Sequence, residues 1–220
     1  MTKTAVVTGC WGFIGNHLTK KLLENGWYVY GIDKHTYVAN QEQLLYFTEN
    51  FPSKYKFIED DITKIKRIPQ CDVIFNLAAE SHVENSFYDS KKFIKSNIDG
   101  VRNLLQIIDC TLSSFDKPLF FHVSTDEVYG DREEGYFDED AQLNPSNPYA
   151  ATKAGAEFLA KSYLRSFALP LIITRGNNVY GPHQYPEKLV PKFINQLKRG
   201  RKVTLHGTGA NKRNFLYVED

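Results

Sequence analysis

Short runs of apolar residues alternate along the chain with longer segments whose apolar positions recur at helical spacing. The short runs predict strands at residues 5–7, 29–32, 57–58, 73–77, 119–123 and 171–174. The clearest helical patterns cover residues 14–24, 91–110 and 149–167. Strands that alternate with helices in this way form a parallel sheet with helices on both faces. The pattern therefore predicts an α/β fold of the Rossmann type, with a doubly wound parallel sheet.

One segment interrupts the alternation of strands and helices. Residues 131–148 are rich in acidic side chains and contain two prolines. Such a composition is typical of a surface loop. Because acidic runs in loops are usually solvated edges, we assign this segment no chemistry.

Composition narrows the range of partners. The chain has 220 residues, of which 42% are hydrophobic, and its formal net charge is only +1. That size suits one α/β domain, or one domain and the beginning of a second, and that charge lacks the positive field of nucleic-acid binders. Cys10, Cys71 and Cys110 are scattered, and no Cys or His pair has zinc-ligand spacing. With no signal peptide and no long apolar run, we expect a cytoplasmic protein that holds no metal and binds neither nucleic acid nor membrane.

A glycine-rich segment, residues 8–15, follows the first predicted strand and opens the first predicted helix. The pyrophosphate of a dinucleotide binds at such a position, where backbone N–H groups are free. Gly9 suits the tight turn, Gly12 allows close approach of the phosphate, and Gly15 lets the helix lie close to the strand. Alone, this spacing marks a tight strand-to-helix turn as readily as a cofactor site.

Asp33 strengthens the cofactor interpretation. It ends the second predicted strand, 24 positions after Gly9 (33 minus 9). A carboxylate there binds the adenosine ribose and repels a 2′-phosphate, so NAD is favoured over NADP, although Lys34 beside it weighs the other way. Asp61, after the third strand, suits either the adenine amino group or a turn cap.

A second group of polar residues lies near the fifth strand and the last clear helix. Thr125, Asp126 and Glu127 follow the strand, and Tyr149 and Lys153 begin the helix. A Tyr and a Lys four residues apart share one helical face, so the ammonium can support the ionised phenol. That spacing alone is common on surface helices, but the glycine segment and Thr125 favour a catalytic interpretation.

Several motifs together give the chain a resemblance to the nucleotide-sugar 4,6-dehydratase family of extended short-chain dehydrogenases/reductases. It is most similar to the eukaryotic and giant-virus type of this family. The motifs are residues 9–15, 77–83, 124–130, 147–153, 177–182, 186–189 and 213–217.

The resemblance implies a reaction in which water is removed from a nucleoside-diphosphate hexose through temporary oxidation at C4. It implies that Tyr149 takes the O4 proton while NAD takes the C4 hydride, that Glu127 removes the C5 proton, and that protonated Asp126 donates to the leaving C6 hydroxyl. The hydride then returns to C6. The adjacent acids separate dehydratases from related 4-epimerases and decarboxylases. These relatives, and a non-catalytic dinucleotide-binding regulator on the same fold, remain the alternatives.

The resemblance also implies further contacts. Cofactor contacts would include Phe13, Ile14, Ile62 and Ala78, beside the residues already named. Substrate contacts would include Ser81 and His82 near the sugar, Asn178 and Arg213 at the diphosphate, and Lys188 nearby. Packing roles or ordinary surface charges are the alternatives for this second group. Thr204 and His206 fall where the family contacts the pyrimidine, and UDP-glucose is favoured over dTDP-glucose as the substrate.

For domain organisation, we expect an NAD-binding Rossmann domain over residues 1–175 and the beginning of a sugar-nucleotide lobe over residues 176–220. Family members continue well beyond this point, so we expect the sequence to be a truncated form. The family also implies a homodimer, in which the helices at residues 91–110 and 149–167 of two subunits form a four-helix bundle.

Overall fold

The structure is a computed structural model that describes residues 2–34, 36–37, 39–111, 117–205 and 207–220. The chain forms two compact units, Met1–Arg175 and Gly176–Asp220. None of the helices in these ranges is both long and apolar enough to cross a bilayer.

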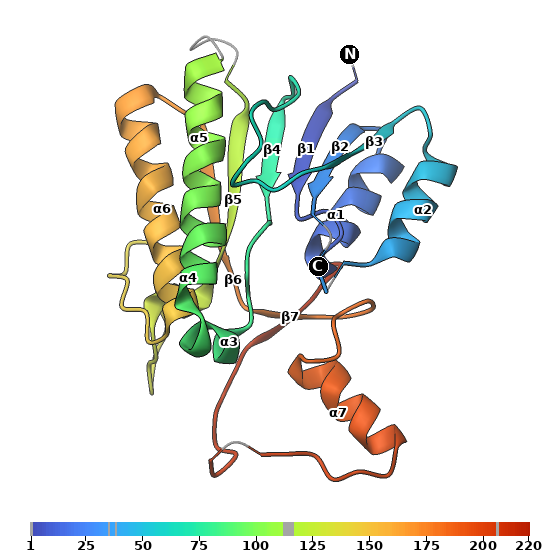
Figure 1. The fold of residues 1–220 in the computed structure, drawn as a ribbon. Helices are drawn as coiled ribbons and strands as arrows, with labels where there is room; N and C mark the ends of the chain where they lie inside the picture. The colour runs from blue at the N-terminus through green and yellow to red at the C-terminus, as the bar shows by residue number, and fades with distance from the viewer. Residues whose placement is uncertain (1, 35, 38, 112–116, 206) are drawn as a thin grey trace. The chain divides into compact units, whose positions relative to one another are not determined.

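The first unit is built on a six-stranded sheet with the order β3-β2-β1-β4-β5-β6 (Figure 1). The pairs β1·β2, β1·β4, β2·β3 and β4·β5 are parallel. This order is that of a doubly wound dinucleotide-binding sheet, so the predicted fold is confirmed. The strands are β1 (Thr4–Thr8), β2 (Tyr28–Asp33), β3 (Tyr55–Glu59), β4 (Val73–Asn76), β5 (Leu119–Thr125) and β6 (Leu171–Gly176).

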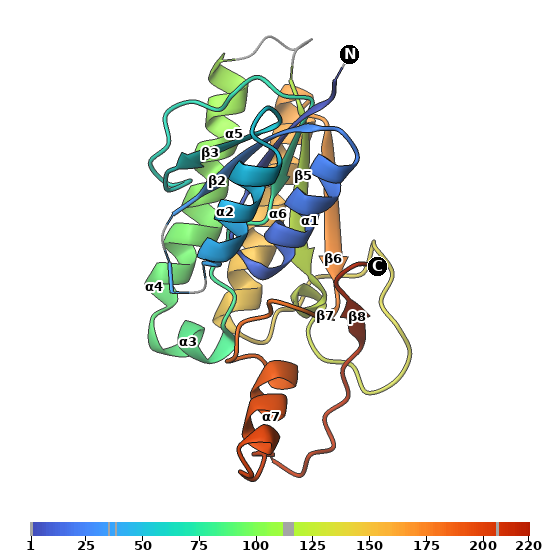
Figure 2. The same ribbon diagram turned by 90° about the vertical axis from the view of Figure 1, so that its right-hand side faces the viewer.

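Helices cover both faces of this sheet (Figures 1 and 2). Helices α1 (Phe13–Glu24) and α2 (Gln41–Asn50) cover one face, and α5 (Gly100–Thr111) and α6 (Pro148–Phe167) cover the other. Strand β1 shows why two cores form, because successive side chains of a strand point to opposite faces. Val6 packs in one buried cluster with α5, whereas Ala5 and Val7 pack in the other with residues of α1 and α2.

The helix predicted over residues 91–110 is not one regular α-helix. It consists of α4 (Ser90–Phe93), a π-helix (Ile94–Asp99) and α5, and it follows the short helix α3 (Val83–Tyr88). The wide π-turn contains Asn97, which is buried at 1% exposure. Its side chain makes three hydrogen bonds to groups outside the helix. Apolar periodicity cannot reveal this change of hydrogen-bonding pattern.

The start of α6 is defined by a side-chain cap. Asn147 accepts a hydrogen bond from the Ala150 N–H at 2.8 Å, and Pro148 occupies the first helical position. Both residues are favoured at these sites because the cap satisfies a free N–H and proline needs none. The preceding residues, 130–147, form no helix or strand, as predicted for the acidic loop.

The second unit contains less regular structure. Strands β7 (Asn178–Tyr180) and β8 (Phe215–Tyr217) form a parallel pair in which Asn178 is in register with Phe215. Helix α7 (Leu189–Lys198) lies between them in sequence and has no buried residue. None of these three elements was predicted, because the strands are only three residues long and α7 lacks a capping side chain.

Candidate active site

The glycine segment makes a close turn between β1 and α1. Gly9 has φ +71°, which favours glycine, and its N–H donates to the Ile32 carbonyl at 2.8 Å. A Cβ at Gly15 would lie 2.0 Å from the Gly9 carbonyl oxygen, so only glycine fits there. Gly12 precedes α1 and supplies no side-chain cap. The first-turn N–H groups of Phe13, Ile14 and Gly15 therefore form a cradle suited to an anion such as a pyrophosphate.

Asp33 is held beside this turn at the end of β2. Its carboxylate accepts from the Trp11 N–H at 2.8 Å and from the Lys34 N–H at 2.8 Å. Lys34 turns its ammonium to Asp61, at 3.0 Å from Oδ2. The Lys34 ammonium, which would favour NADP, is thus paired with the Asp61 carboxylate. The site therefore fits the unphosphorylated ribose of NAD.

The other predicted cofactor residues, Asp61, Ile62 and Ala78, differ in their surroundings. Asp61 accepts from the Thr63 N–H at 2.9 Å, as its capping alternative predicted. Burial acts to raise the pKa of Asp61, but bonds from Thr63 and Lys34 prevail and lower it. The side chain of Ile62 is only 5% exposed and packs in the core. Ala78 lies against Gly9, since a Cβ on Gly9 would be 2.8 Å from the Ala78 nitrogen.

The acidic pair lies on a 3-10 helix, Asp126–Tyr129, directly after β5. The Thr125 hydroxyl donates to Asp126 Oδ1 at 3.2 Å and accepts from the Glu127 N–H at 3.3 Å. Glu127 Oε2 also accepts from the side-chain amide of Asn147 at 2.9 Å. The Asp126 carboxyl group is therefore held by Thr125, and the Glu127 carboxyl group by Asn147 at the start of α6.

Tyr149, in the first turn of α6, lies in the electrostatic field of these acids. Burial, with the charges of Glu127 and Asp126, raises the pKa of the Tyr149 phenol, and a hydrogen bond with Thr125 opposes that shift. The acidic pair and the tyrosine therefore share one site. The raised pKa favours the protonated form of the phenol.

Lys153 lies one turn further along α6 and is 4% exposed. Burial lowers its pKa to about 8, and the nearby Glu157 carboxylate opposes this shift. Its ammonium donates to the Val123 carbonyl oxygen at 2.7 Å. This bond fixes the lysine between β5 and α6, and its support of an ionised Tyr149 stays a prediction.

Two asparagines join this site although neither was among the predicted site residues. Asn147 contacts Glu127, and its position before a proline at the start of a helix could have indicated a cap. Asn97 donates to the Glu80 carbonyl at 3.0 Å and to the Thr152 hydroxyl at 2.9 Å. No sequence signal indicates Asn97, because its role depends on the π-turn.

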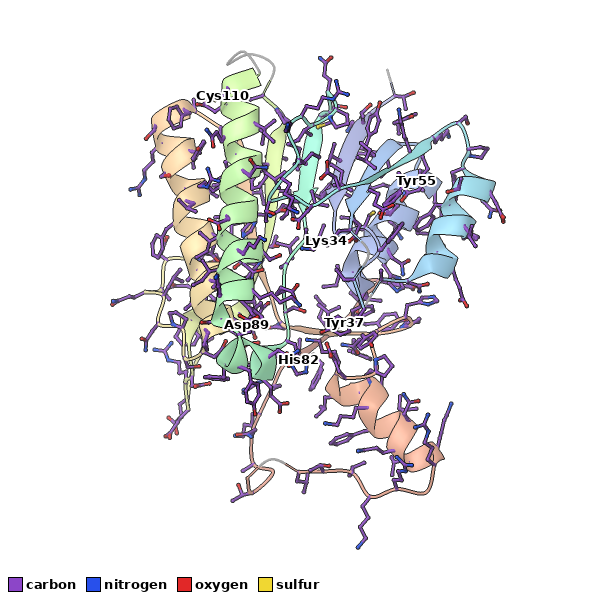
Figure 3. The ribbon with its side chains drawn as sticks, viewed as in Figure 1. Lys34, Tyr37, Tyr55, His82, Asp89 and Cys110 are labelled. Carbon is purple, nitrogen blue, oxygen red and sulfur yellow. The ribbon has the colours of Figure 1, made fainter. Side chains whose placement is uncertain are left out.

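The predicted substrate residues lie in both units. In the first, Ser81 is exposed, and His82 caps the start of α3, where its Nδ1 accepts from the Asn85 N–H at 3.3 Å (Figure 3). The second unit contains Asn178, Lys188 and Arg213. Asn178 donates its N–H to the carbonyl of Asn214 at 3.2 Å, Lys188 precedes α7, and Arg213 is exposed. Thr204 is exposed, and His206 lies outside the described residues.

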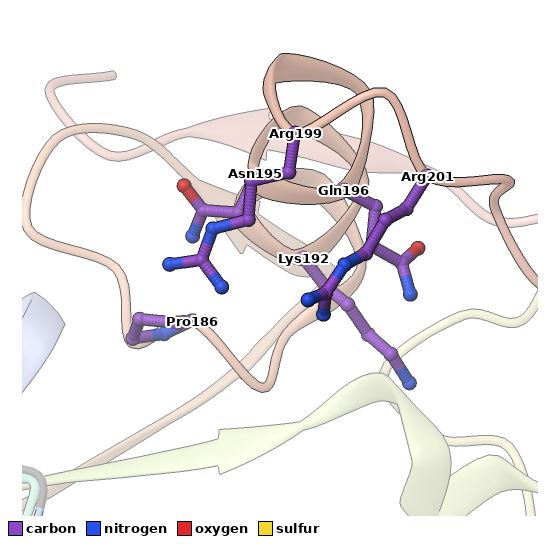
Figure 4. A pocket seen from close by; sticks show the side chains of 6 residues that line it. All are labelled: Pro186, Lys192, Asn195, Gln196, Arg199 and Arg201. Carbon is purple, nitrogen blue, oxygen red and sulfur yellow. The ribbon is translucent and has the colours of Figure 1, made fainter.

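A pocket of about 260 Å³ lies beside α7 in the second unit (Figure 4). It does not involve any of the predicted substrate residues. The residues that line it include three cations and two amides: Pro186, Lys192, Asn195, Gln196, Arg199 and Arg201.

The sheet order, the phosphate cradle and the Tyr149–Lys153 helix define an α/β dinucleotide-binding protein of the short-chain dehydrogenase/reductase class. The GDP-mannose 4,6 dehydratase family model matches residues 6–220. The chain belongs to this family of nucleotide-sugar 4,6-dehydratases, as its motifs predicted.

Two curated relatives are each 42% identical to the chain. One is the dTDP-D-glucose 4,6-dehydratase of Dictyostelium discoideum, aligned over 98% of this chain and 52% of its own length. The other is a trifunctional UDP-glucose 4,6-dehydratase, 3,5-epimerase and reductase of Arabidopsis thaliana, aligned over 99% of this chain and 34% of its own length. The chain thus spans about half or less of either relative.

Solved structures of related enzymes have the same fold. The dTDP-glucose 4,6-dehydratase DesIV of Streptomyces venezuelae, solved with NAD and TYD, gives a TM-score of 0.88 at 36% identity, over 98% of this chain and 68% of that one. A UDP-glucuronic acid 4-epimerase of Bacillus cereus, solved with UDP-glucuronic acid and NAD, gives 0.90 at 31% identity, over 98% and 69%. Structural likeness alone therefore does not separate dehydration from epimerisation.

Proposed function

We propose that the protein catalyses NAD-dependent dehydration of a nucleoside-diphosphate glucose to the 4-keto-6-deoxy sugar nucleotide. The observation that carries this proposal is that the Thr125 hydroxyl bonds to Asp126 Oδ1 and to the Glu127 N–H, while the charges of both acids raise the pKa of the nearby Tyr149 phenol. Elimination of water needs a base and an acid beside the group that handles the O4 proton. An adjacent pair of carboxyl groups next to a half-buried phenol meets that need.

The cofactor follows from the cradle and the carboxylate. The first-turn N–H groups of α1 would hold the pyrophosphate, and Asp33 would bind the adenosine ribose. When bound, NAD would supply the oxidant for C4 of the hexose and, as NADH, the hydride for C6. The NAD found in the solved DesIV structure agrees with this assignment.

Tyr149 is assigned to the O4 proton. Its raised pKa means that the phenolate forms only when positive charge is brought close to it. The Lys153 ammonium, fixed one turn further along α6, would provide such charge. Thr125, which hydrogen-bonds with the phenol, would orient it towards the sugar hydroxyl.

Glu127 and Asp126 are assigned to the elimination. Once C4 is a ketone, the C5 proton is acidic, and Glu127 would remove it. The electron pair of that C–H bond forms the C5–C6 double bond as the C6–O bond breaks. Protonated Asp126 would give its proton to the departing hydroxyl, so that one water leaves. When hydride is added at C6, Glu127 would return its proton to C5. Asn147, at 2.9 Å, would orient the Glu127 carboxylate for its task.

For the nucleotide, we favour UDP-glucose and place dTDP-glucose second. The two differ in the base by one methyl group, a difference that changes binding by only about 1–3 kcal/mol. Of the two curated relatives, which are equally identical to the chain, one is named a UDP-glucose and the other a dTDP-D-glucose 4,6-dehydratase. The whole protein that carries this sequence should be incubated with each sugar nucleotide, and the product followed by mass. A 4-keto-6-deoxy product supports the proposal, whereas a product of unchanged mass with inverted C4 would indicate a 4-epimerase.

We further propose that the protein is a homodimer. Helices α5 and α6 pack side by side on one face of the sheet. The outer side of this layer exposes apolar residues, with Phe158 exposed at 61%, Leu164 at 45% and Ile94 at 47%. Covering such residues with the same helices of a second subunit would form a four-helix bundle.

A further inference from the structure

The proposed reaction requires two segments to keep a fixed relative position. Glu127 and Asp126 lie on the 3-10 helix after β5, whereas Tyr149 and Lys153 lie on α6. Between them the chain runs through residues 130–147, which form no helix or strand. Asn147 links the two segments through its bond to Glu127, and contacts from elsewhere can add to this link.

Arg175, near the end of β6, is firmly anchored to α6 through Glu157. Its Nη2 lies 2.8 Å from Glu157 Oε2, and its Nε lies 3.1 Å from each carboxylate oxygen. Glu157 is fully buried, and the Arg175 side chain is 10% exposed. The hydrogen bonds that Arg175 donates to Glu157 raise the pKa of Arg175, so the guanidinium keeps its charge. A buried fork-to-carboxylate pair of this kind has a fixed geometry.

The same guanidinium also holds the end of the 3-10 helix. Nη1 donates to the Tyr129 hydroxyl at 2.7 Å and to the Glu139 carbonyl at 2.9 Å. The guanidinium carbon lies 4.8 Å from the centre of the Tyr129 ring, which stacks on Phe137 at 5.0 Å. Tyr129 is two residues after Glu127, on the same short helix. One side chain thus joins α6, the carboxylate-bearing helix and the intervening loop.

We propose that Arg175 is a positioning residue, which through Glu157 and Tyr129 holds the Asp126–Glu127 helix in register with the Tyr149–Lys153 helix. This inference rests on the proposed function and adds to it a determinant that touches neither substrate nor cofactor. Loss of the contact should slow elimination more than oxidation at C4, because the 3-10 helix would shift while α6 keeps its place in the core.

The test uses Tyr129→Phe in the whole protein that carries this sequence. This change removes only the hydroxyl that Arg175 binds, and it leaves the ring stack and the Arg175–Glu157 pair in place. The matched control is Tyr136→Phe, which removes a hydroxyl from a tyrosine that is 85% exposed in the same loop. Arg175→Lys keeps the positive charge but loses the forked geometry of the guanidinium. This variant and the double variant Arg175→Lys/Tyr129→Phe complete a double-mutant cycle.

For Tyr129→Phe we expect kcat for dehydration to fall on the order of ten-fold, the size expected when one charge-assisted hydrogen bond is lost. KM should stay unchanged, and enzyme-bound NADH should build up during turnover. In the Arg175→Lys background, Tyr129→Phe should have little further effect. Tyr136→Phe should match the unmodified protein.

Two results would overturn the inference while the proposed function stands. One is a Tyr129→Phe variant with the kcat of Tyr136→Phe. The other is a Tyr129→Phe variant that loses oxidation and elimination equally, which a merely structural role would produce. If the unmodified protein forms no 4-keto-6-deoxy product from either sugar nucleotide, the proposed function itself fails, and the inference fails with it.

Discussion

The Asn147 side chain donates a hydrogen bond of 2.9 Å to the Glu127 carboxylate, while its oxygen accepts from the Ala150 N–H at 2.8 Å. One side chain thus caps the helix that carries Tyr149 and orients the proposed base at C5. Two substitutions can separate these tasks, because aspartate can cap a helix but cannot donate to a carboxylate.

Asn147→Asp should keep the cap and lose the donor. We expect stability close to that of the unmodified protein and slower dehydration, because the Glu127 carboxylate loses its donor and faces a second carboxylate. Asn147→Ala should slow dehydration and also lower the free energy of unfolding by about 1 kcal/mol. Chemical denaturation and initial rates measure both. Unchanged rates in Asn147→Asp would refute the orienting role.

Lys153 provides a prediction about stability. Its pKa in the folded protein is lowered to about 8 from 10.5, mainly by burial. Between these values, the unfolded chain binds a proton that the folded chain has lost, so stability rises with pH. With bound nucleotide removed, the unfolding free energy should rise more steeply with pH in the unmodified protein than in Lys153→Met. The difference between the two should change by about 1.4 kcal/mol per pH unit in this window, in favour of the unmodified protein.

Denaturant unfolding at a series of pH values measures this gain. Lys161→Met, on the same helix, controls for loss of a lysine. A constant difference between the unmodified protein and Lys153→Met from pH 8 to about 10 would show that the lysine is not perturbed by burial.

Much of this arrangement was predictable from the sequence. All six strands of the main sheet were predicted, because each is a short apolar run. The spacing of the glycines also indicated the phosphate cradle. The structure explains Gly9 and Gly15, because a Cβ at either position would clash with backbone atoms. These features depend on local composition and spacing, which a sequence displays directly.

The missed features depend on contacts between distant segments. Arg175 and Glu157 are 18 residues apart in sequence, and Asn97 and Thr152 are 55 apart. Neither pair has a spacing that predicts contact. The π-turn at Asn97 likewise follows from its three bonds to other segments, and the side chain of Ile62 was assigned to the cofactor although it packs in the core.

Tightly held NAD is expected, because a reaction cycle that returns its own hydride gains nothing by releasing the cofactor. The purified protein should be denatured and the supernatant analysed for nucleotides. NAD should be recovered, and Asp33→Ser should increase the share of NADP, because it removes the charge that repels a 2′-phosphate. Recovery of NADP alone from the unmodified protein would contradict the assignment of Asp33.

The proposed dimer can be tested on its exposed apolar face. Phe158→Glu should convert the dimer to a monomer, because a charge cannot be buried there without a partner. The matched control is Leu45→Glu, on α2 of the opposite face, at the same exposure of 61%. Light scattering at micromolar concentration distinguishes the states. A monomer in the unmodified protein, or a dimer that survives Phe158→Glu, would refute the proposed interface.

The most direct test of the proposed chemistry is the behaviour of Glu127→Gln with bound sugar nucleotide. Tyr149, Lys153 and Thr125 remain in this variant, so oxidation at C4 should proceed while removal of the C5 proton stops. Absorbance of enzyme-bound NADH should accumulate, and the 4-keto-6-deoxy product should not be released at a comparable rate. Tyr149→Phe should give neither signal. Dehydration by Glu127→Gln at nearly the normal rate would contradict the assignment of the base and remove the main reason for proposing a dehydratase.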